Sequence, residues 1–95
     1  MSKEELLQAK RQEILGLAAR YGAYNVRVFG SVARGESGPA SDIDFLVDLK
    51  PDVGLEYVAL WQDLQDLLGC GVDLVTEQAL PGYLRKRVLQ EAVPL

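Results

Sequence analysis

Hydrophobic residues recur every three or four positions in three parts of the chain, which is the spacing of amphipathic helices. The pattern predicts one helix from Lys3 to about Arg20, a second from Gly54 to Leu68 and a third from Tyr83 to about Ala92. Trp61 falls on the apolar stripe of the second helix, so we interpret it as a core residue rather than a base-stacking one. Between these helices lie three shorter runs with the composition of β-strands, Val26 to Phe29, Asp42 to Leu49 and Val72 to Thr76.

The strand from Asp42 to Leu49 carries charge on one face and apolar side chains on the other. Alternation along a strand places Ile43, Phe45 and Val47 toward a core and Asp42 with Asp44 on the opposite face. The Cα atoms of the two acids would lie roughly 6.7 Å apart. At an effective dielectric constant near 20, their carboxylates would repel by on the order of 2–3 kcal/mol. A bound cation would offset that cost, so the pair is a candidate metal site.

A second candidate element precedes this strand. Gly30 and Ser31 follow the first predicted strand and open a short helix or turn, where free backbone N–H groups suit phosphate oxygens. A phosphate could approach Gly30 without meeting a Cβ. A phosphate-binding turn beside paired carboxylates indicates a nucleotide site. Asp48 shares the face of Asp44 but lies roughly 13 Å further on, so we assign it to solvent or to the turn at Pro51.

The segment GSVARGESGPASDIDFLVDL, from Gly30 to Leu49, resembles the minimal nucleotidyltransferase family of antitoxins, within the polymerase-beta-like nucleotidyltransferase superfamily. The similarity continues through Val72 to Thr76 and into the end of the last helix. It implies an α/β (α+β) nucleotidyltransferase fold: a small mixed sheet of three or four strands, flanked by helices, with the first two strands antiparallel. Residues 1–95 are predicted to form a single domain of this kind.

The resemblance also implies the roles of the acidic residues. Asp42 and Asp44 are candidate ligands that bridge two Mg²⁺ ions, which would bind the attacking and leaving oxygens of nucleotidyl transfer. Asp73 would ligate the second ion and help to take the proton of the acceptor hydroxyl. The alternative for Asp73 is an edge strand with its carboxylate in solvent.

Four further residues are candidates for binding the substrate ATP. Gly30 and Ser31 would hold the β- and γ-phosphates, and Arg34 is placed to reach them from the next turn. An ion pair with Glu36 would also explain Arg34. Ser41 is a further nucleotide-binding candidate, with closure of its own loop as the alternative.

Composition narrows the chemistry. The chain has 95 residues and a net charge of −4, which argues against a general nucleic-acid binder. It has no histidine and one cysteine, so carboxylates must carry any acid–base or metal chemistry. Neither a Walker P-loop nor a Rossmann glycine fingerprint is present. No membrane span or signal peptide is recognisable, so we expect a cytoplasmic protein.

A catalytic core of this size leaves little chain to bind an acceptor, so we expect the acceptor to be a separate molecule. The family resemblance implies a HEPN-domain toxin, silenced by transfer of AMP to a tyrosine hydroxyl. One alternative is a non-catalytic antitoxin that neutralises its partner by occlusion. Others are transfer to a small-molecule or RNA hydroxyl, and a structural aspartate pair at a sheet edge.

Overall fold

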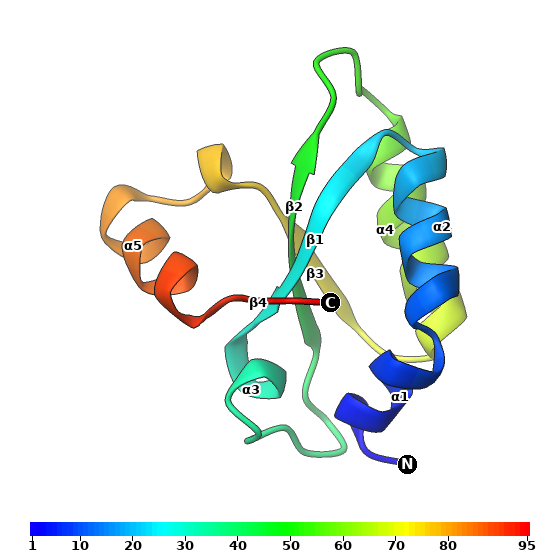
Figure 1. The fold of residues 1–95 in the computed structure, drawn as a ribbon, viewed down its shortest axis with the longest axis vertical. Helices are drawn as coiled ribbons and strands as arrows, with labels where there is room; N and C mark the ends of the chain where they lie inside the picture. The colour runs from blue at the N-terminus through cyan, green and yellow to red at the C-terminus, as the bar shows by residue number, and fades with distance from the viewer.

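The computed structural model describes residues 1–95 and contains a four-stranded sheet in the order β3-β2-β1-β4 (Figure 1). The strands are β1 (Ala23–Phe29), β2 (Ile43–Leu49), β3 (Val72–Val75) and β4 (Val93–Pro94). β1 is antiparallel to β2 and β4, whereas β2 and β3 are parallel. The predicted mixed sheet with antiparallel first strands is therefore confirmed. The two-residue β4 is an addition that the sequence pattern did not reveal.

Helices lie on both faces of this sheet. On one face α2 (Arg11–Arg20) and α4 (Glu56–Leu68) run side by side, with α1 (Lys3–Ala9) leading into α2 (Figure 1). The other face is partly covered by the short helix η1 (Glu77–Ala79) and by α5 (Gly82–Glu91). The four-residue α3 (Gly30–Ala33) follows β1 directly and packs against α5. None of these helices has the length and apolar character needed to cross a lipid bilayer.

The central strand β2 contributes to two separate cores. Ile43, Phe45 and Val47 are fully buried among the side chains of α2 and α4, as the alternation predicted. Leu46 is also fully buried, but on the opposite face, where it packs with Leu80 and Val88 of the α5 region. Asp44 lies on that second face, so this side of the sheet combines a small apolar core with a carboxylate.

The N-terminal helix is not continuous, contrary to the prediction. It is divided into α1 and α2 at Lys10, whose backbone (φ −102°, ψ 7°) departs from the helical conformation. Hydrogen bonds from Lys10 N to Leu6 O (3.0 Å) and from Ile14 N to Lys10 O (2.9 Å) still span the break, so the chain bends without separating. Leu7 and Ile14, on either side of the bend, both lie in the larger core. No glycine or proline marks this position, and packing overrides the local helical preference.

Side chains of α4 hydrogen-bond to the outer edge of β3. The indole N–H of Trp61 donates to the carbonyl of Val72 (2.6 Å), and the hydroxyl of Tyr57 donates to the carbonyl of Leu74. Gln65 accepts a hydrogen bond from the Val72 N–H (3.3 Å). Trp61 is 37% exposed, so its prediction as a core residue is wrong. Its amphipathic ring instead joins the helix to the edge strand.

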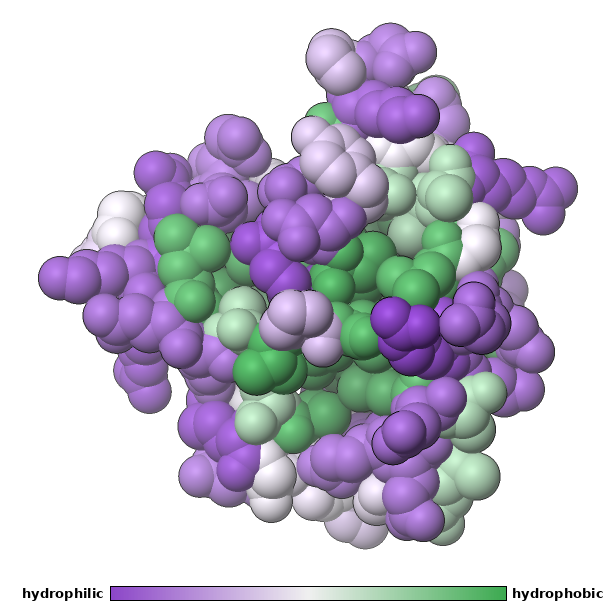
Figure 2. Space-filling view, in the orientation of Figure 1, coloured by the Kyte–Doolittle hydropathy of each residue, from purple (hydrophilic) through white to green (hydrophobic).

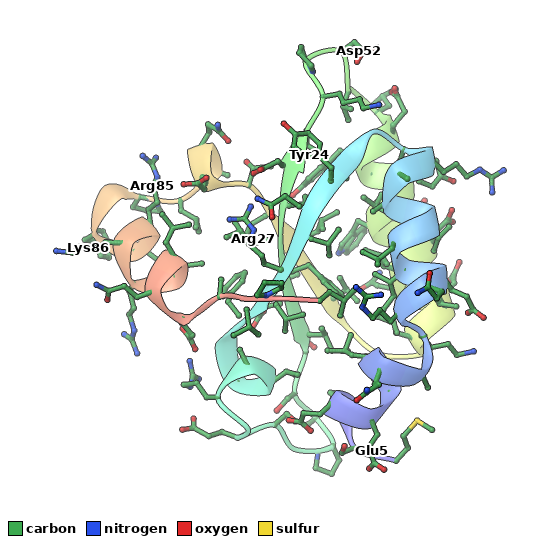
Figure 3. All side chains as sticks on the ribbon, in the orientation of Figure 1. Glu5, Tyr24, Arg27, Asp52, Arg85 and Lys86 are labelled. Carbon is green, nitrogen blue, oxygen red and sulfur yellow. The ribbon has the colours of Figure 1, made fainter.

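Asp48 is likewise not a solvent or turn residue. Its carboxylate accepts hydrogen bonds from the guanidinium of Arg27 and from the Asn25 side chain, both at 2.9 Å. Figure 3 shows Arg27 on the α5 side of the sheet. Asn25 has a φ of 50°, and the β1–β2 register shifts between Tyr24 and Arg27. Side-chain hydrogen bonds therefore join β2 to the irregular part of β1, and the local sequence pattern does not predict them.

The contact between Tyr57 and the edge strand predicts a measurable stability difference. Tyr57→Phe removes the hydroxyl and leaves the Leu74 carbonyl without this donor, so we expect a loss of about 1–2 kcal/mol in the free energy of unfolding. Tyr83→Phe is the matched control, because Tyr83 is 84% exposed and should change stability by less than about 0.5 kcal/mol. Urea denaturation monitored by circular dichroism measures both. Equal losses in the two variants would contradict the role assigned to Tyr57.

Candidate functional site

The candidate site lies where three segments of chain meet at one end of the sheet. Asp44 is opposite Phe29 in the antiparallel β1–β2 register, and it is beside Asp73 in the parallel β2–β3 register. Asp73 alternates with the buried Val72 and Leu74, which places its side chain on the same face as Asp44. Gly30 follows Phe29 directly. The sheet thus brings together Gly30, Asp44 and Asp73, which are far apart in sequence.

Two glycines make room for the carboxylates. A Cβ placed on Gly30 would lie 1.9 Å from Oδ2 of Asp44, and Gly30 also has a φ of 74°. A Cβ on Gly71 would lie 2.2 Å from Oδ1 of Asp42. Gly30 was expected to leave space for a phosphate, but in this structure the space beside it is filled by the Asp44 side chain. Gly71, which precedes β3, was missed as a site residue because its neighbour Asp42 is distant in sequence.

The three aspartates have different surroundings. Asp44 is half-buried, whereas Asp42 and Asp73 are exposed. Burial is the main cause that raises the pKa of Asp44 to about 7, followed by a hydrogen bond to Asp73 and by repulsion from Asp73, Asp42 and Glu91. Asp73 does lie on an edge strand, as the alternative for this residue proposed, and its role as a metal ligand or base stays a prediction. Its carboxylate is open to solvent and also adjacent to Asp44.

The donor atoms suit a hard divalent cation. Carboxylate oxygens are the ligands that Mg²⁺ prefers, and a cation between Asp44 and Asp73 would offset the repulsion that helps to raise the pKa of Asp44. The side chains do not form a ready-made cluster of three metal-binding groups, and the Asp42 carboxylate lies against Gly71. The residues therefore fit a cation at Asp44 and Asp73, with Asp42 beside them.

The three other predicted site residues, Ser31, Ser41 and Arg34, differ in their hydrogen-bond and ion-pair partners. The hydroxyl of Ser31, in α3, has no hydrogen-bond partner within the chain. Ser41 accepts a hydrogen bond from the Gly38 N–H (2.9 Å), so it closes its own loop, as the alternative for this residue proposed. Arg34 forms ion pairs with Glu36 (2.9 Å) and with Glu91. The ion pair with Glu36 is the alternative given above for Arg34. The ion pair with Glu91, which is distant in sequence, was not predicted.

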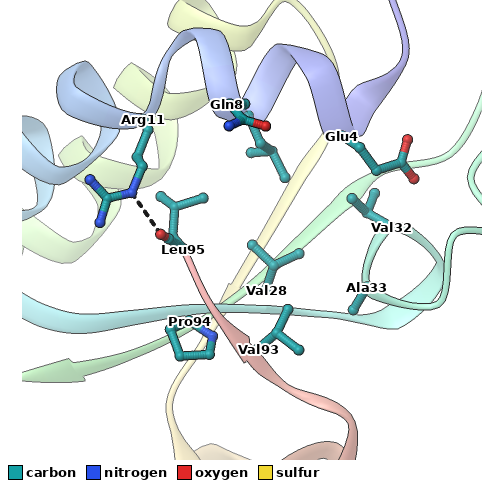
Figure 4. Close-up of a pocket in the computed structure, with 10 residues that line it drawn as sticks. Glu4, Gln8, Arg11, Val28, Val32, Ala33, Val93, Pro94 and Leu95 are labelled. Atoms are coloured by element: carbon teal, nitrogen blue, oxygen red, sulfur yellow. Dashed lines mark hydrogen bonds between the residues drawn. The ribbon is translucent and has the colours of Figure 1, made fainter.

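The largest pocket lies elsewhere, on the face of the sheet that carries α1 and α2. It has a volume of about 450 Å³ between α1, α3 and β4, with an apolar floor that includes Leu7, Val28 and Val32 (Figure 4). Arg11 on its rim donates a hydrogen bond to the Leu95 carbonyl (2.8 Å). Figure 2 shows hydrophobic residues gathered near the C-terminus in this region. The pocket contains none of the three aspartates, so pocket size and candidate chemistry do not coincide.

Comparison with known proteins supports the assignment of the fold. Residues 11–95 match the family model described as a nucleotidyltransferase domain. The chain is 40% identical over 92 residues to protein adenylyltransferase MntA of Thermococcus cleftensis, covering 95% of this chain and 89% of that protein. These matches show that the chain belongs to the nucleotidyltransferase domain family.

Two solved structures extend the comparison. One, described as a minimal nucleotidyltransferase, is 47% identical with a TM-score of 0.89, and the match covers 99% of this chain and 97% of that one. The other, a toxin–antitoxin crystal structure with AMP-PNP, has a TM-score of 0.74 at 23% identity and covers 98% of this chain and 72% of that one. The second likeness concerns the fold alone. The first places the chain among the minimal nucleotidyltransferases.

The contact between Gly30 and Asp44 can be measured by substitution. Gly35→Ala should cost about 1–2 kcal/mol, because Gly35 has a similar φ of 71° but open space around its Cα. Gly30→Ala should cost more, because its Cβ also collides with the Asp44 carboxylate. In an Asp44→Ala background, the cost of Gly30→Ala should fall to that of Gly35→Ala. Urea denaturation of the four variants tests this, and an unchanged cost in that background would refute the steric contact.

The raised pKa of Asp44 predicts how the stability of the metal-free protein depends on pH. The folded state holds the Asp44 proton with a pKa of about 7, against 3.8 for the ordinary group. The stabilising contribution is therefore complete below about pH 4 and is lost as the pH rises through 7. Asp44→Asn, which has no proton to lose, should show a smaller decrease between pH 5 and pH 8. Urea unfolding in chelator-treated buffers measures the difference, and parallel pH profiles would contradict it.

Proposed function

We propose that this protein transfers AMP from ATP to a hydroxyl group of a partner toxin, and thereby acts as its antitoxin. The observation that carries the proposal is the placement of Asp44 beside Asp73 and against Gly30, which Ser31 follows in the chain. It is supported by the identity to protein adenylyltransferase MntA over most of both chains. The toxin–antitoxin structure of the same fold contains AMP-PNP, an ATP analogue, which is consistent with ATP as the substrate.

The acidic residues would hold Mg²⁺ and the reacting groups. We assign Asp42, Asp44 and Asp73 as the ligands that would hold the ions. Bound Mg²⁺ would neutralise charge on the α-phosphate and lower the pKa of the acceptor hydroxyl. Half-buried Asp44, held in place by β2 and Gly30, supplies the fixed ligand. Exposed Asp73 is accessible from solvent and is the residue assigned to take the acceptor proton at its carboxylate.

The turn after β1 would hold the triphosphate. Ser31 has a free hydroxyl at the start of α3, directly after Gly30, and would donate a hydrogen bond to a phosphate oxygen together with the backbone of Gly30 and Ser31. Ser41 would contribute by keeping the loop after α3 closed through Gly38. The pyrophosphate would leave from this side, while the α-phosphate lies toward the aspartates.

The acceptor would be a tyrosine hydroxyl of a HEPN-domain toxin. A tyrosine side chain is long enough to enter the open side of the site, where Asp73 lies at the sheet edge. The family resemblance supports this partner, and the toxin–antitoxin likeness agrees with it. A non-catalytic antitoxin that occludes its toxin is the second candidate function. The apolar pocket away from the aspartates favours it, because such a surface could hold a partner without chemistry.

Labelled nucleotide tests the proposal. The purified protein is incubated with Mg²⁺, ATP labelled in its α-phosphate and the toxin encoded by the adjacent gene. Label should appear on the toxin, at a tyrosine identified by mass spectrometry, and chelator should abolish it. Asp44→Asn and Asp73→Asn should each reduce transfer by about 100-fold or more, because each removes an anionic ligand for the Mg²⁺ that would neutralise charge on the α-phosphate.

Asp66→Asn is the matched control, since Asp66 is exposed on α4 away from the site. It should transfer label at the normal rate. Undiminished transfer by Asp44→Asn would refute the catalytic assignment. Neutralisation of the toxin without transfer of label would favour the occlusion mechanism instead.

A further inference from the structure

Arg34 is shared by two carboxylates that differ sharply in exposure. Its guanidinium pairs with Glu36, close by in sequence, and with Glu91 at the end of α5. The Glu36 side chain is 63% exposed, whereas that of Glu91 is 16% exposed. Solvent screens an exposed charge strongly and a half-buried one much less. Solvent therefore screens the charge of Glu36, whereas the charge of Glu91 is neutralised mainly by its ion pair with Arg34.

Glu91 also borders the candidate site. Its helix α5 packs against α3, which begins at Gly30 and Ser31. The backbone N–H of Arg34 donates to the carbonyl of Gly30 (3.1 Å), so the ion pair with Arg34 places the Glu91 carboxylate next to the turn that begins at Gly30. Glu91 is thus a fourth acidic group close to the place where a triphosphate would bind. A triphosphate and an unpaired carboxylate in such a site would repel each other.

We propose that Arg34 serves as the counter-charge of Glu91, so that the triphosphate of ATP can bind beside a carboxylate that would otherwise repel it. Arg34 is then a positioning residue that acts through Glu91 and does not contact the phosphates. This inference rests on the proposed function, because it takes ATP as the ligand. It assigns Glu91, which the sequence pattern left unnoticed, a place in the electrostatics of the site.

The counter-charge role predicts a specific pattern of rescue. Arg34→Ala should weaken binding of ATP with Mg²⁺ by about tenfold, since one uncompensated charge near the phosphates costs roughly that factor at an effective dielectric constant of 20. Adding Glu91→Gln should restore the affinity to within about threefold of the original. Arg34→Lys, which keeps a positive charge beside Glu91, should also remain within about threefold. Isothermal titration calorimetry with ATP and Mg²⁺ measures these affinities without an acceptor.

Glu36 provides the internal control. Because its carboxylate is largely in solvent, adding Glu36→Gln to Arg34→Ala should leave the tenfold loss unchanged. In transfer assays the Arg34→Ala defect should appear in KM for ATP, with kcat close to the original. Thermal unfolding of each variant confirms that the fold is intact, and Arg34→Lys keeps the test available if Arg34→Ala is unstable.

Two results would overturn the inference. If Glu91→Gln fails to restore the affinity of Arg34→Ala, Arg34 contacts the phosphates itself. If Glu91→Gln alone weakens ATP binding as much as Arg34→Ala does, the pair has a structural role in joining α3 to α5. Failure of the proposed function is distinguishable, because it would appear as normal ATP binding, with the same rescue pattern, but no label on the toxin.

Discussion

The close approach of the Asp44 carboxylate to Gly30 is the constraint on which the rest of the site depends. β2 is buried from both faces, so its register is set by Phe45 on one side and Leu46 on the other. That register leaves Asp44 with a single position, beside Asp73 and against the backbone of Gly30. A glycine at this turn is then required for two reasons, its positive φ and the absence of a Cβ. The turn that begins at Gly30 and the carboxylates consequently form one structural unit.

Much of this unit could be predicted from local pattern. Alternation along Asp42 to Leu49 identified the core residues Ile43, Phe45 and Val47, and the acidic residue within the β3 run indicated Asp73. The motif itself, through its family resemblance, indicated the antiparallel start of the sheet. These features share one property: each is encoded within a few neighbouring residues, where side-chain periodicity and turn composition are informative.

What could not be predicted depends on contacts between distant segments. The bend at Lys10 contains no glycine or proline that would have indicated it. Trp61 lies on the apolar stripe of α4, yet its indole N–H donates a hydrogen bond to the edge strand β3. Asp48 was predicted to be a surface charge, but the guanidinium of Arg27 on β1 donates a hydrogen bond to its carboxylate. The sheet places Gly71 against Asp42, and α5 places Glu91 beside Arg34. Neither contact could be inferred from the sequence. In each case tertiary structure supplies the partner, and a single sequence does not encode where that partner lies.

The hydrogen bonds from α4 to β3 have a consequence for how any macromolecule reaches the aspartates. Tyr57, Trp61 and Gln65 already occupy backbone groups of Val72 and Leu74 that an added strand would need. An incoming polypeptide cannot extend the sheet alongside Asp73 while those bonds persist. The face that α5 only partly covers has no such obstacle. The architecture thus favours a protruding side chain over an extended peptide as the group that reaches this end of the sheet.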